Sequence, residues 1–224
     1  MTIEFRSMKP IWGLREPLSG ISHFAGFILS IAGLLWLIRN ALTSGKILHL
    51  FAFSLFGVSL VLLYLSSTVY HSVNAHEKHI TWLKRIDHMM IFVLIAGTYT
   101  PICLIAIGGL DGWLYFSAIW FLAALGMLCK VFWLGMPRWG YVLIYLVMSW
   151  LGVLLLPAVN PLIKQALVFW LGIGGLFYSV GAVIYALKWP NFSAGVWEFH
   201  ETWHLFVLGG SLCHFMAIQT CAQL

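Results

Sequence analysis

Residues 47–70, ILHLFAFSLFGVSLVLLYLSSTVY, contain no Asp, Glu, Lys or Arg and decide the fold class. A helix rises about 1.5 Å per residue, so about 20 apolar residues cross the hydrocarbon core of a bilayer. Uncharged runs of this kind occur seven times along the 224 residues. The fourth run ends at residue 129, and its span is extended to residue 133 because Lys130 can snorkel to the headgroups. The predicted spans are residues 18–38, 47–70, 89–107, 113–133, 141–159, 166–187 and 202–224. The sequence therefore predicts an all-α membrane protein, one domain built as a seven-transmembrane helical bundle.

The composition excludes an ordinary soluble domain. Hydrophobic residues make up 62% of the chain and charged residues only 8%, whereas soluble domains carry about a quarter charged residues. The formal charge of +5 could suggest nucleic acid as a partner. The cations lie in short connections between apolar runs, however, and form no basic stripe with interleaved aromatic residues. We expect membrane lipid as the partner and no nucleic acid, and no protein partner can be inferred.

The distribution of Lys and Arg predicts the orientation, because cytoplasmic loops carry an excess of these residues. With a cytoplasmic N-terminus, nine of them fall inside: Arg6, Lys9, Arg15, Lys78, Lys84, Arg85, Lys130, Arg138 and Lys188. Three fall outside: Arg39, Lys46 and Lys164. We therefore expect the N-terminus in the cytoplasm and the C-terminus outside.

Five polar side chains stand at the ends of predicted spans. Ser67 and His71 end the second span and share one helical face, because they are four residues apart. Asp87 begins the third span. His200 and His204, in the sequence HETWH, open the seventh span and also share a face. The three span ends meet the same membrane boundary, so the imidazoles and the carboxyl group are expected at one depth.

Three imidazoles and a carboxylate at one depth predict a metal site, with Zn²⁺ as the expected ion. His71, His200 and His204 would supply three neutral nitrogen ligands, and Asp87 would hold or deprotonate a water at the fourth position. The HExxH spacing also offers Glu201 as a general base. The alternative reading, which we favour, makes Glu201 a solvated acid stabilised by a helix N-terminus. A further alternative is that the histidines only pack in the bundle.

The remaining histidines are expected outside the metal site. His23 lies one to two turns inside the first span, where a packing role is favoured over support of the site. His214 lies ten residues beyond His204, about 15 Å along the helix, too far to share an ion. His76, His79 and His88 lie in or beside a loop and are expected to be solvated.

Taken together, Ser67-(x3)-His71, Asp87 and His200-(x3)-His204 resemble the progestin and adipoQ receptor family, also called PAQR or adiponectin receptor-like. The surrounding SSTVYHS, DHMMIFVLIAGTYTP and HETWHLFVLGGSLCHF are similar to its bacterial branch, the hemolysin III proteins. The resemblance covers all seven spans. It implies zinc on the three histidines, with the metal's water held by Asp87 and with Ser67 nearby. It also implies a multi-pass protein of the bacterial inner membrane.

The family resemblance also implies a distant relationship to alkaline ceramidases, which use a similar site to hydrolyse a lipid amide. The first hypothesis is therefore a zinc-dependent hydrolase in membrane lipid homeostasis, in which Asp87 takes a proton and Ser67 stabilises the oxyanion. Adiponectin receptors lack an acid at the position of Glu201, so this residue is not expected to be essential. The second hypothesis is a non-catalytic sensor or regulator of lipid composition with structural zinc. The third is a cytolytic hemolysin.

Overall fold

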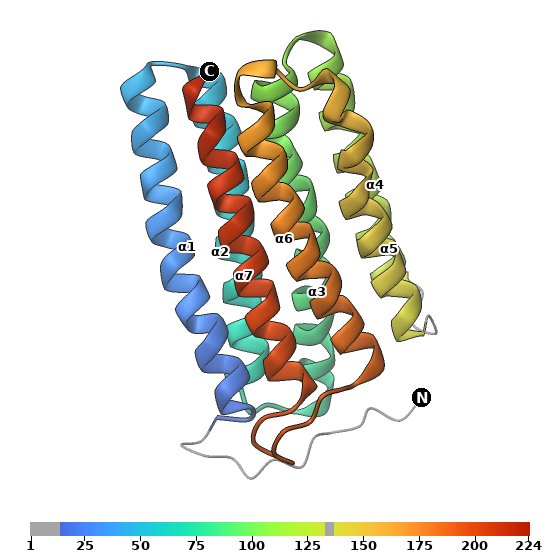
Figure 1. Cartoon of the computed structure of the whole chain (residues 1–224). Helices are drawn as coiled ribbons and strands as arrows, with labels where there is room; N and C mark the ends of the chain where they lie inside the picture. Colours follow the sequence, from blue (N-terminus) through green and yellow to red (C-terminus); the bar gives the residue numbers. More distant parts are fainter. Residues whose placement is uncertain (1–13, 133–136) are drawn as a thin grey trace.

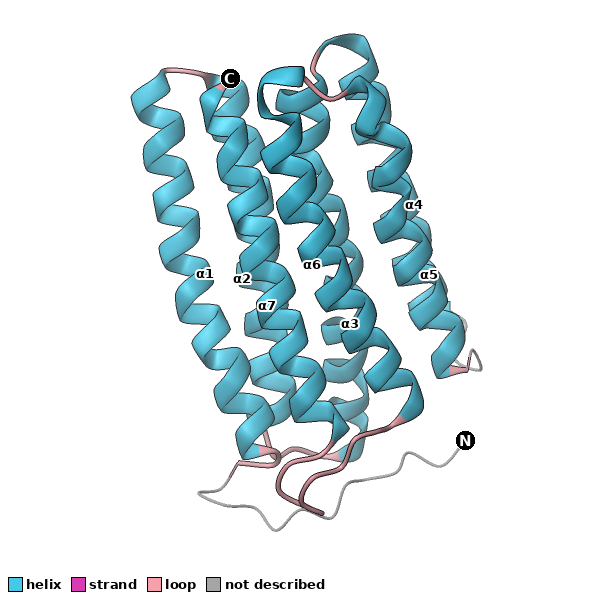
Figure 2. Cartoon of the chain, in the orientation of Figure 1, coloured by secondary structure: helices cyan, strands magenta, loops and turns pink. Residues whose placement is uncertain are grey.

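Seven helices long and apolar enough to cross a membrane form the chain, within the residues that the structure describes, 14–132 and 137–224. In this computed structural model they stand side by side in one bundle, and residues 188–198 form a longer loop between α6 and α7 (Figures 1 and 2). The α-helices are α1 Pro17–Ser44, α2 Ile47–Ser72, α3 Glu77–Pro101, α4 Gly109–Phe132, α5 Arg138–Trp150, α6 Pro161–Leu187 and α7 Phe199–Thr220. Shorter turns extend three of them: η1 Ile102–Ile107, η2 Leu151–Ala158 and η3 Cys221–Gln223.

Helices satisfy every backbone hydrogen bond internally, which is why apolar segments in lipid adopt this form. The observed helices reach beyond most of the predicted spans. α3 begins at Glu77, well before residue 89, because the polar segment continues the helix and the His76 ring accepts a hydrogen bond from the Lys78 backbone N–H. Residue 133, the predicted end of the fourth span, and the cations Arg6 and Lys9 lie outside the described residues.

One end of the bundle collects the segments that carry the predicted site. α1, α3, α5 and α7 begin there and α2, α4 and α6 end there, at the bottom of Figure 1. The C-terminus lies at the opposite end. We call the first of these ends the site end. The alternation follows from seven successive crossings of one bundle, and it brings the end of α2 beside the starts of α1 and α7.

Close packing near the site end depends on Gly26 of α1. A Cβ atom at this position would lie 2.7 Å from the ring of Tyr64 on α2 and 2.8 Å from Leu208 on α7. The Tyr64 ring cannot easily withdraw, because it is buried and its hydroxyl donates a 2.7 Å hydrogen bond to Ser211. Small residues and polar contacts hold helices together in lipid, where apolar surfaces gain little from association. Gly26 thus lets α1 approach α2 and α7 one turn away from His23.

A cavity of about 1600 Å³ lies between α3, α5, α6 and α7. Its walls are mostly apolar or aromatic over the length of α3, from Thr81 at the site end to Ile102 beyond Pro101. All the charged side chains of its lining lie near the site end, whereas Val159 and Leu167 line it near the opposite end and His214 lines it deeper along α7. The cavity therefore has a polar end and a long apolar body.

Candidate metal centre

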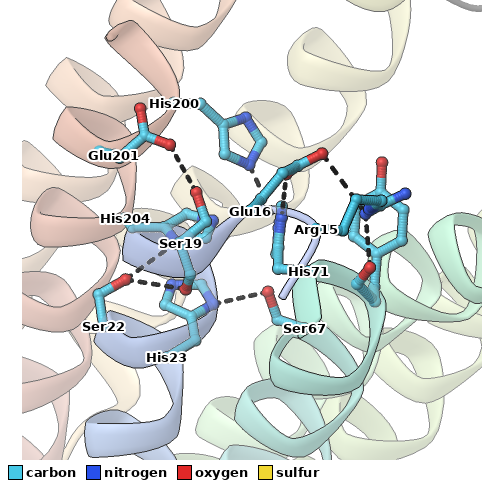
Figure 3. A network of polar contacts seen from close by, with 11 residues as sticks. Arg15, Glu16, Ser19, Ser22, His23, Ser67, His71, His200, Glu201 and His204 are labelled. Carbon is cyan, nitrogen blue, oxygen red and sulfur yellow. Dashed lines mark hydrogen bonds and ion pairs between the residues drawn. The ribbon is translucent and has the colours of Figure 1, made fainter. Parts of the chain in front are cut away.

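The three predicted imidazoles meet at the site end. His71 comes from the last turn of α2, and His200 and His204 come from the first two turns of α7 (Figure 3). One potential ligand atom from each of the three lies within 4.8 Å of the others, and the Nε2 atoms of His71 and His200 are 3.3 Å apart. Two nitrogen ligands of a tetrahedral zinc ion lie roughly 3.3 Å apart, given a zinc–nitrogen distance of about 2.0–2.1 Å. The spacing therefore suits a shared ion.

Burial makes an unused nitrogen at this place costly. His71 and His204 have no exposed surface, and Nε2 of His204 has no hydrogen-bond partner among the described residues. An unsatisfied buried polar atom costs about 1–3 kcal/mol. A metal ion among the three rings would accept the lone pair and remove this cost. Three neutral imidazoles suit zinc, and also copper, iron and nickel, so this set of residues fits a resident transition metal.

Contacts behind the rings direct their lone pairs toward this common point. The Nδ1 atom of His71 lies 2.5 Å from Oε2 of Glu16, so its N–H donates to that carboxylate and Nε2 is left for a ligand. On His204, Nδ1 lies 3.3 Å from the Ser22 hydroxyl. Histidine ligands of metals typically use their second nitrogen in this way, which fixes the tautomer and the ring orientation. Residues at the start of α1 thus support both rings.

Glu16 is the site residue that the sequence did not reveal. Besides His71, its carboxylate pairs with the Arg15 guanidinium at 3.5 Å, and its backbone N–H donates to the His71 carbonyl at 2.9 Å. The guanidinium of Arg15 also donates to the Tyr70 carbonyl. In the sequence Glu16 only marks the border of the first apolar run. Its partner lies 55 residues away, and no local pattern connects the two.

Glu201 is buried, so the expectation of a solvated acid is wrong. Only 3% of the residue is exposed. One carboxylate oxygen accepts a 2.7 Å hydrogen bond from the Ser19 hydroxyl, and the other accepts the Glu198 backbone N–H at 2.9 Å. Glu198 and Glu201 together form a capping box at the start of α7. Glu201 is therefore associated with a helix N-terminus, as predicted. Its side chain, however, is surrounded by protein and not by water.

Asp87 and Ser67 lie next to the three histidines. Asp87 is buried on α3, close enough to His71 and to the Ser67 hydroxyl to interact with both, but it is not among the three groups that share the central point. The Ser67 hydroxyl lies 2.6 Å from Nδ1 of His23, and the His23 ring stacks on His204 with 3.5 Å between ring centres. His23 is therefore in direct contact with the candidate centre.

The structure separates the other histidines from the candidate centre. His214 packs against Tyr178, with 5.1 Å between ring centres, deeper along α7. His76 and His79 are exposed, as expected. His88 is not a solvated loop residue: it lies within α3, is half-buried and lines the cavity. The expectation for His88 is wrong because α3 begins before the apolar run does.

The amino-acid sequence of the chain is similar to those of known proteins. Residues 12–215 match the family described as Haemolysin-III related. The hemolysin-3 homolog of Bacillus subtilis (strain 168) is 38% identical over 203 residues, which cover 91% of this chain and 92% of that protein. Hemolysin-3 of Bacillus cereus is 38% identical over 206 residues, 91% and 90% of the two chains. Human monocyte to macrophage differentiation factor is 28% identical over 172 residues, 73% and 67%. The family match includes every residue of the candidate centre.

The geometry predicts that the purified chain carries about one metal ion, and that His71→Ala/His204→Ala removes it, because one remaining imidazole cannot hold the ion. Metal content per chain can be measured by mass spectrometry after gel filtration. His76→Ala/His79→Ala is the matched control, since both residues are exposed histidines near the same end. Equal metal content in the first double variant and the wild type would contradict a site built on these rings.

Glu16→Gln should weaken metal binding by about 10–100-fold, because the amide keeps the shape of the side chain but loses the negative charge behind His71. Competition with a chelator of known affinity measures the change. Glu77→Gln removes an exposed carboxylate from the first turn of α3 and should leave affinity unchanged. If Glu16→Gln binds the metal as tightly as the wild type does, Glu16 does not support the centre.

Proposed function

Because the chain belongs to the haemolysin-III related family, we propose that it is a zinc-site membrane protein that hydrolyses the amide bond of a membrane lipid. One observation carries this proposal. His200, Asp87 and Glu16 line the same 1600 Å³ cavity whose body is mostly apolar. A metal centre that opens into an apolar cavity inside a bilayer suits a substrate with one polar, reactive end and a long acyl chain. The activity would serve membrane lipid homeostasis.

The residues around the triad offer the groups that amide hydrolysis needs. Zinc at this place would supply a Lewis acid that polarises the carbonyl and activates water. The Asp87 carboxylate would take a proton from the attacking water and return one to the departing nitrogen. Water is thus added across the carbon–nitrogen bond, and the products are a fatty acid and an amine. Glu201 has no role in this scheme, because both its oxygens already accept hydrogen bonds.

Ser67 is the proposed donor to the carbonyl oxygen. Its hydroxyl is buried beside Asp87 and His71 and contacts Nδ1 of His23 at 2.6 Å. With a proton on Nδ1, His23 donates to Ser67, and the hydroxyl hydrogen of Ser67 is then directed elsewhere. A donor aimed at the oxygen that becomes negative in the transition state is worth a factor of about 10²–10³ in rate. His23 would thereby orient Ser67.

A second candidate function is a sensor or regulator of lipid composition in which zinc is structural. The burial of the rings favours it: an ion held by His71, His200 and His204 would clip α2 to α7, and Glu16 would add α1 to the same joint. The hydrolase needs the Asp87 carboxylate as a base, whereas a regulator with structural zinc does not. A cytolytic role, as the names of the Bacillus relatives suggest, is less favoured, because seven membrane-length helices leave the chain no evident water-soluble state.

We place the protein in the inner membrane of a bacterial cell with the site end in the cytoplasm. The charges support this orientation: Arg15, Lys84, Arg85, Arg138 and Lys188 all lie toward the site end. A C-terminal alkaline phosphatase fusion should be active, because that enzyme matures only outside the cytoplasm, and a C-terminal green fluorescent protein fusion should be dark. The reverse pair of results would contradict the orientation.

The hydrolase proposal predicts that zinc-loaded protein releases fatty acid from ceramides or simpler N-acyl amides. Asp87→Asn should lower the rate at least about 100-fold, since it removes the general base, while zinc is retained. Fatty acid release is measured by mass spectrometry. Asp111→Asn, which changes a carboxylate at the start of α4 at the opposite end, is the control and should keep full activity.

Two results would reject hydrolysis by this centre: no release from any acyl amide by zinc-loaded protein, or equal rates for Asp87→Asn and the wild type. In the first case, the second candidate function is tested by complementing a strain that lacks the gene and measuring its membrane lipid profile. If Asp87→Asn restores its lipid profile and His71→Ala/His204→Ala does not, zinc acts there as a structural clip.

A further inference from the structure

The site end of the cavity carries more positive charge than the proposed reaction uses. Lys84, Lys130 and Arg138 line it, together with Arg85 and Lys188. They come from α3, α4, α5 and the residue that follows α6. Lys84 lies within electrostatic range of Arg138, and also of the carboxylates of Glu16 and Asp87. We use the name cationic mouth for Lys84, Lys130 and Arg138.

Aromatic rings, not carboxylates, hold two of these cations. The Lys130 ammonium lies 3.7 Å from the centre of the Tyr141 ring, and the Arg138 guanidinium lies 4.8 Å from that of Tyr185. In the part of the chain that the structure describes, no ion pair joins a carboxylate to any member of the cationic mouth, and Nη1 of Arg138 is buried without a hydrogen-bond partner. Cation–π contacts fix a charge in place without neutralising it.

Three acids, Glu16, Asp87 and Glu198, line the same end beside the five cations, and each has another task. Glu198 belongs to the capping box of α7 and accepts the Gly195 backbone N–H. Glu16 accepts from His71 and pairs with Arg15. Asp87 lies beside His71 and Ser67, where the proposed reaction needs it. The mouth therefore keeps a net positive potential that faces a low-dielectric cavity, and such an arrangement attracts and orients an anion. Arg and Lys groups of this kind bind carboxylates and phosphates through charge-assisted hydrogen bonds.

Membrane topology alone does not explain this placement. The positive-inside rule needs cations in the loops at one side of the membrane, and it does not need them on the wall of a cavity. Lys78 shows the difference: it belongs to the same helix as Lys84 and is exposed, and it does not line the cavity. The cavity extends along α3 from Lys84 at the site end to Ile102 near the opposite end, and these two residues are about 27 Å apart along the helix. The cavity thus joins a cationic end to an apolar body of bilayer length.

We propose that the cationic mouth binds the negatively charged headgroup of an acyl lipid whose chain occupies the cavity. This inference rests on the proposed function, and it specifies the substrate class: an N-acyl amide with an anionic head, such as an N-acyl amino acid, in preference to a neutral ceramide. The amide would then lie between the cationic mouth and the three histidines, and the acyl chain would extend along α3 and α6.

Three amides that differ in one feature at a time test the inference. N-Palmitoylglycine has an anionic head, N-palmitoylethanolamine has a neutral head of similar size, and N-acetylglycine has the same anion without the chain. Binding to the zinc-loaded protein in a neutral detergent is followed by tryptophan fluorescence, since Trp139 and Trp203 line the cavity. We expect N-palmitoylglycine to bind about tenfold more tightly than N-palmitoylethanolamine, and N-acetylglycine not to compete.

Single neutralisations identify the residues. Arg138→Gln and Lys84→Gln should each reduce the preference for the anionic amide at least about threefold and leave binding of the neutral amide unchanged. Lys78→Gln removes an equal charge outside the cavity and should change neither. Equal binding of the two palmitoyl amides by the wild type overturns the inference, as does an unchanged preference in both variants. Competition by N-acetylglycine as strong as that by N-palmitoylglycine would show a site for free anions instead.

The outcome for catalysis can be separated from the outcome for binding. Charge-selective binding without fatty acid release from any amide would reject the hydrolase and keep the cationic mouth. Release from the neutral and the anionic amide at equal rates would keep the hydrolase and reject the headgroup preference. A higher rate on N-palmitoylglycine, lost in Arg138→Gln but kept in Lys78→Gln, would support both.

Discussion

The meeting of His71 with His200 and His204 is the contact on which the rest of the structure depends. It joins the end of α2 to the start of α7, helices that are far apart in the sequence. The rings of His71 and His204 are buried, and Nε2 of His71 lies 3.3 Å from Nε2 of His200. In lipid, apolar helices gain little free energy from mutual contact, so polar links have unusual weight. An ion at this point would satisfy Nε2 of His204, which has no hydrogen-bond partner within the described part of the chain, and would hold the helices in register.

Much of this arrangement follows from local patterns in the sequence. Seven uncharged runs predict the seven helices, because lipid forces each apolar segment to satisfy its own backbone. The four-residue spacings in SSTVYH and HETWH predict shared helical faces, and the alternation of crossings puts those faces at one end. These rules need no knowledge of which helices touch. Both the bundle and the grouping of His71, His200 and His204 could therefore be predicted.

Features that depend on contacts between helices could not be predicted in the same way. Glu16 supports His71 across 55 residues, and nothing in the run around Glu16 indicates a partner on α2. Glu201 at a helix start suggested solvent, but Ser19 of α1 covers it. His88 was assigned to a loop because the apolar run begins after it, whereas α3 begins earlier. In each case the neighbouring helix decides the surroundings of the side chain, and hydropathy along one segment does not report it.

The candidate centre, the cavity and the cationic mouth form one continuous arrangement on α2, α3, α4, α5, α6 and α7. This arrangement requires that three imidazoles share one ion, and X-ray absorption at the zinc edge of the purified protein can count the imidazole ligands. The account predicts three nitrogen neighbours from imidazole at about 2.0–2.1 Å, with one further light ligand. A spectrum with sulfur neighbours, with fewer than three imidazoles, or with the octahedral oxygen shell of a loosely held ion would contradict it.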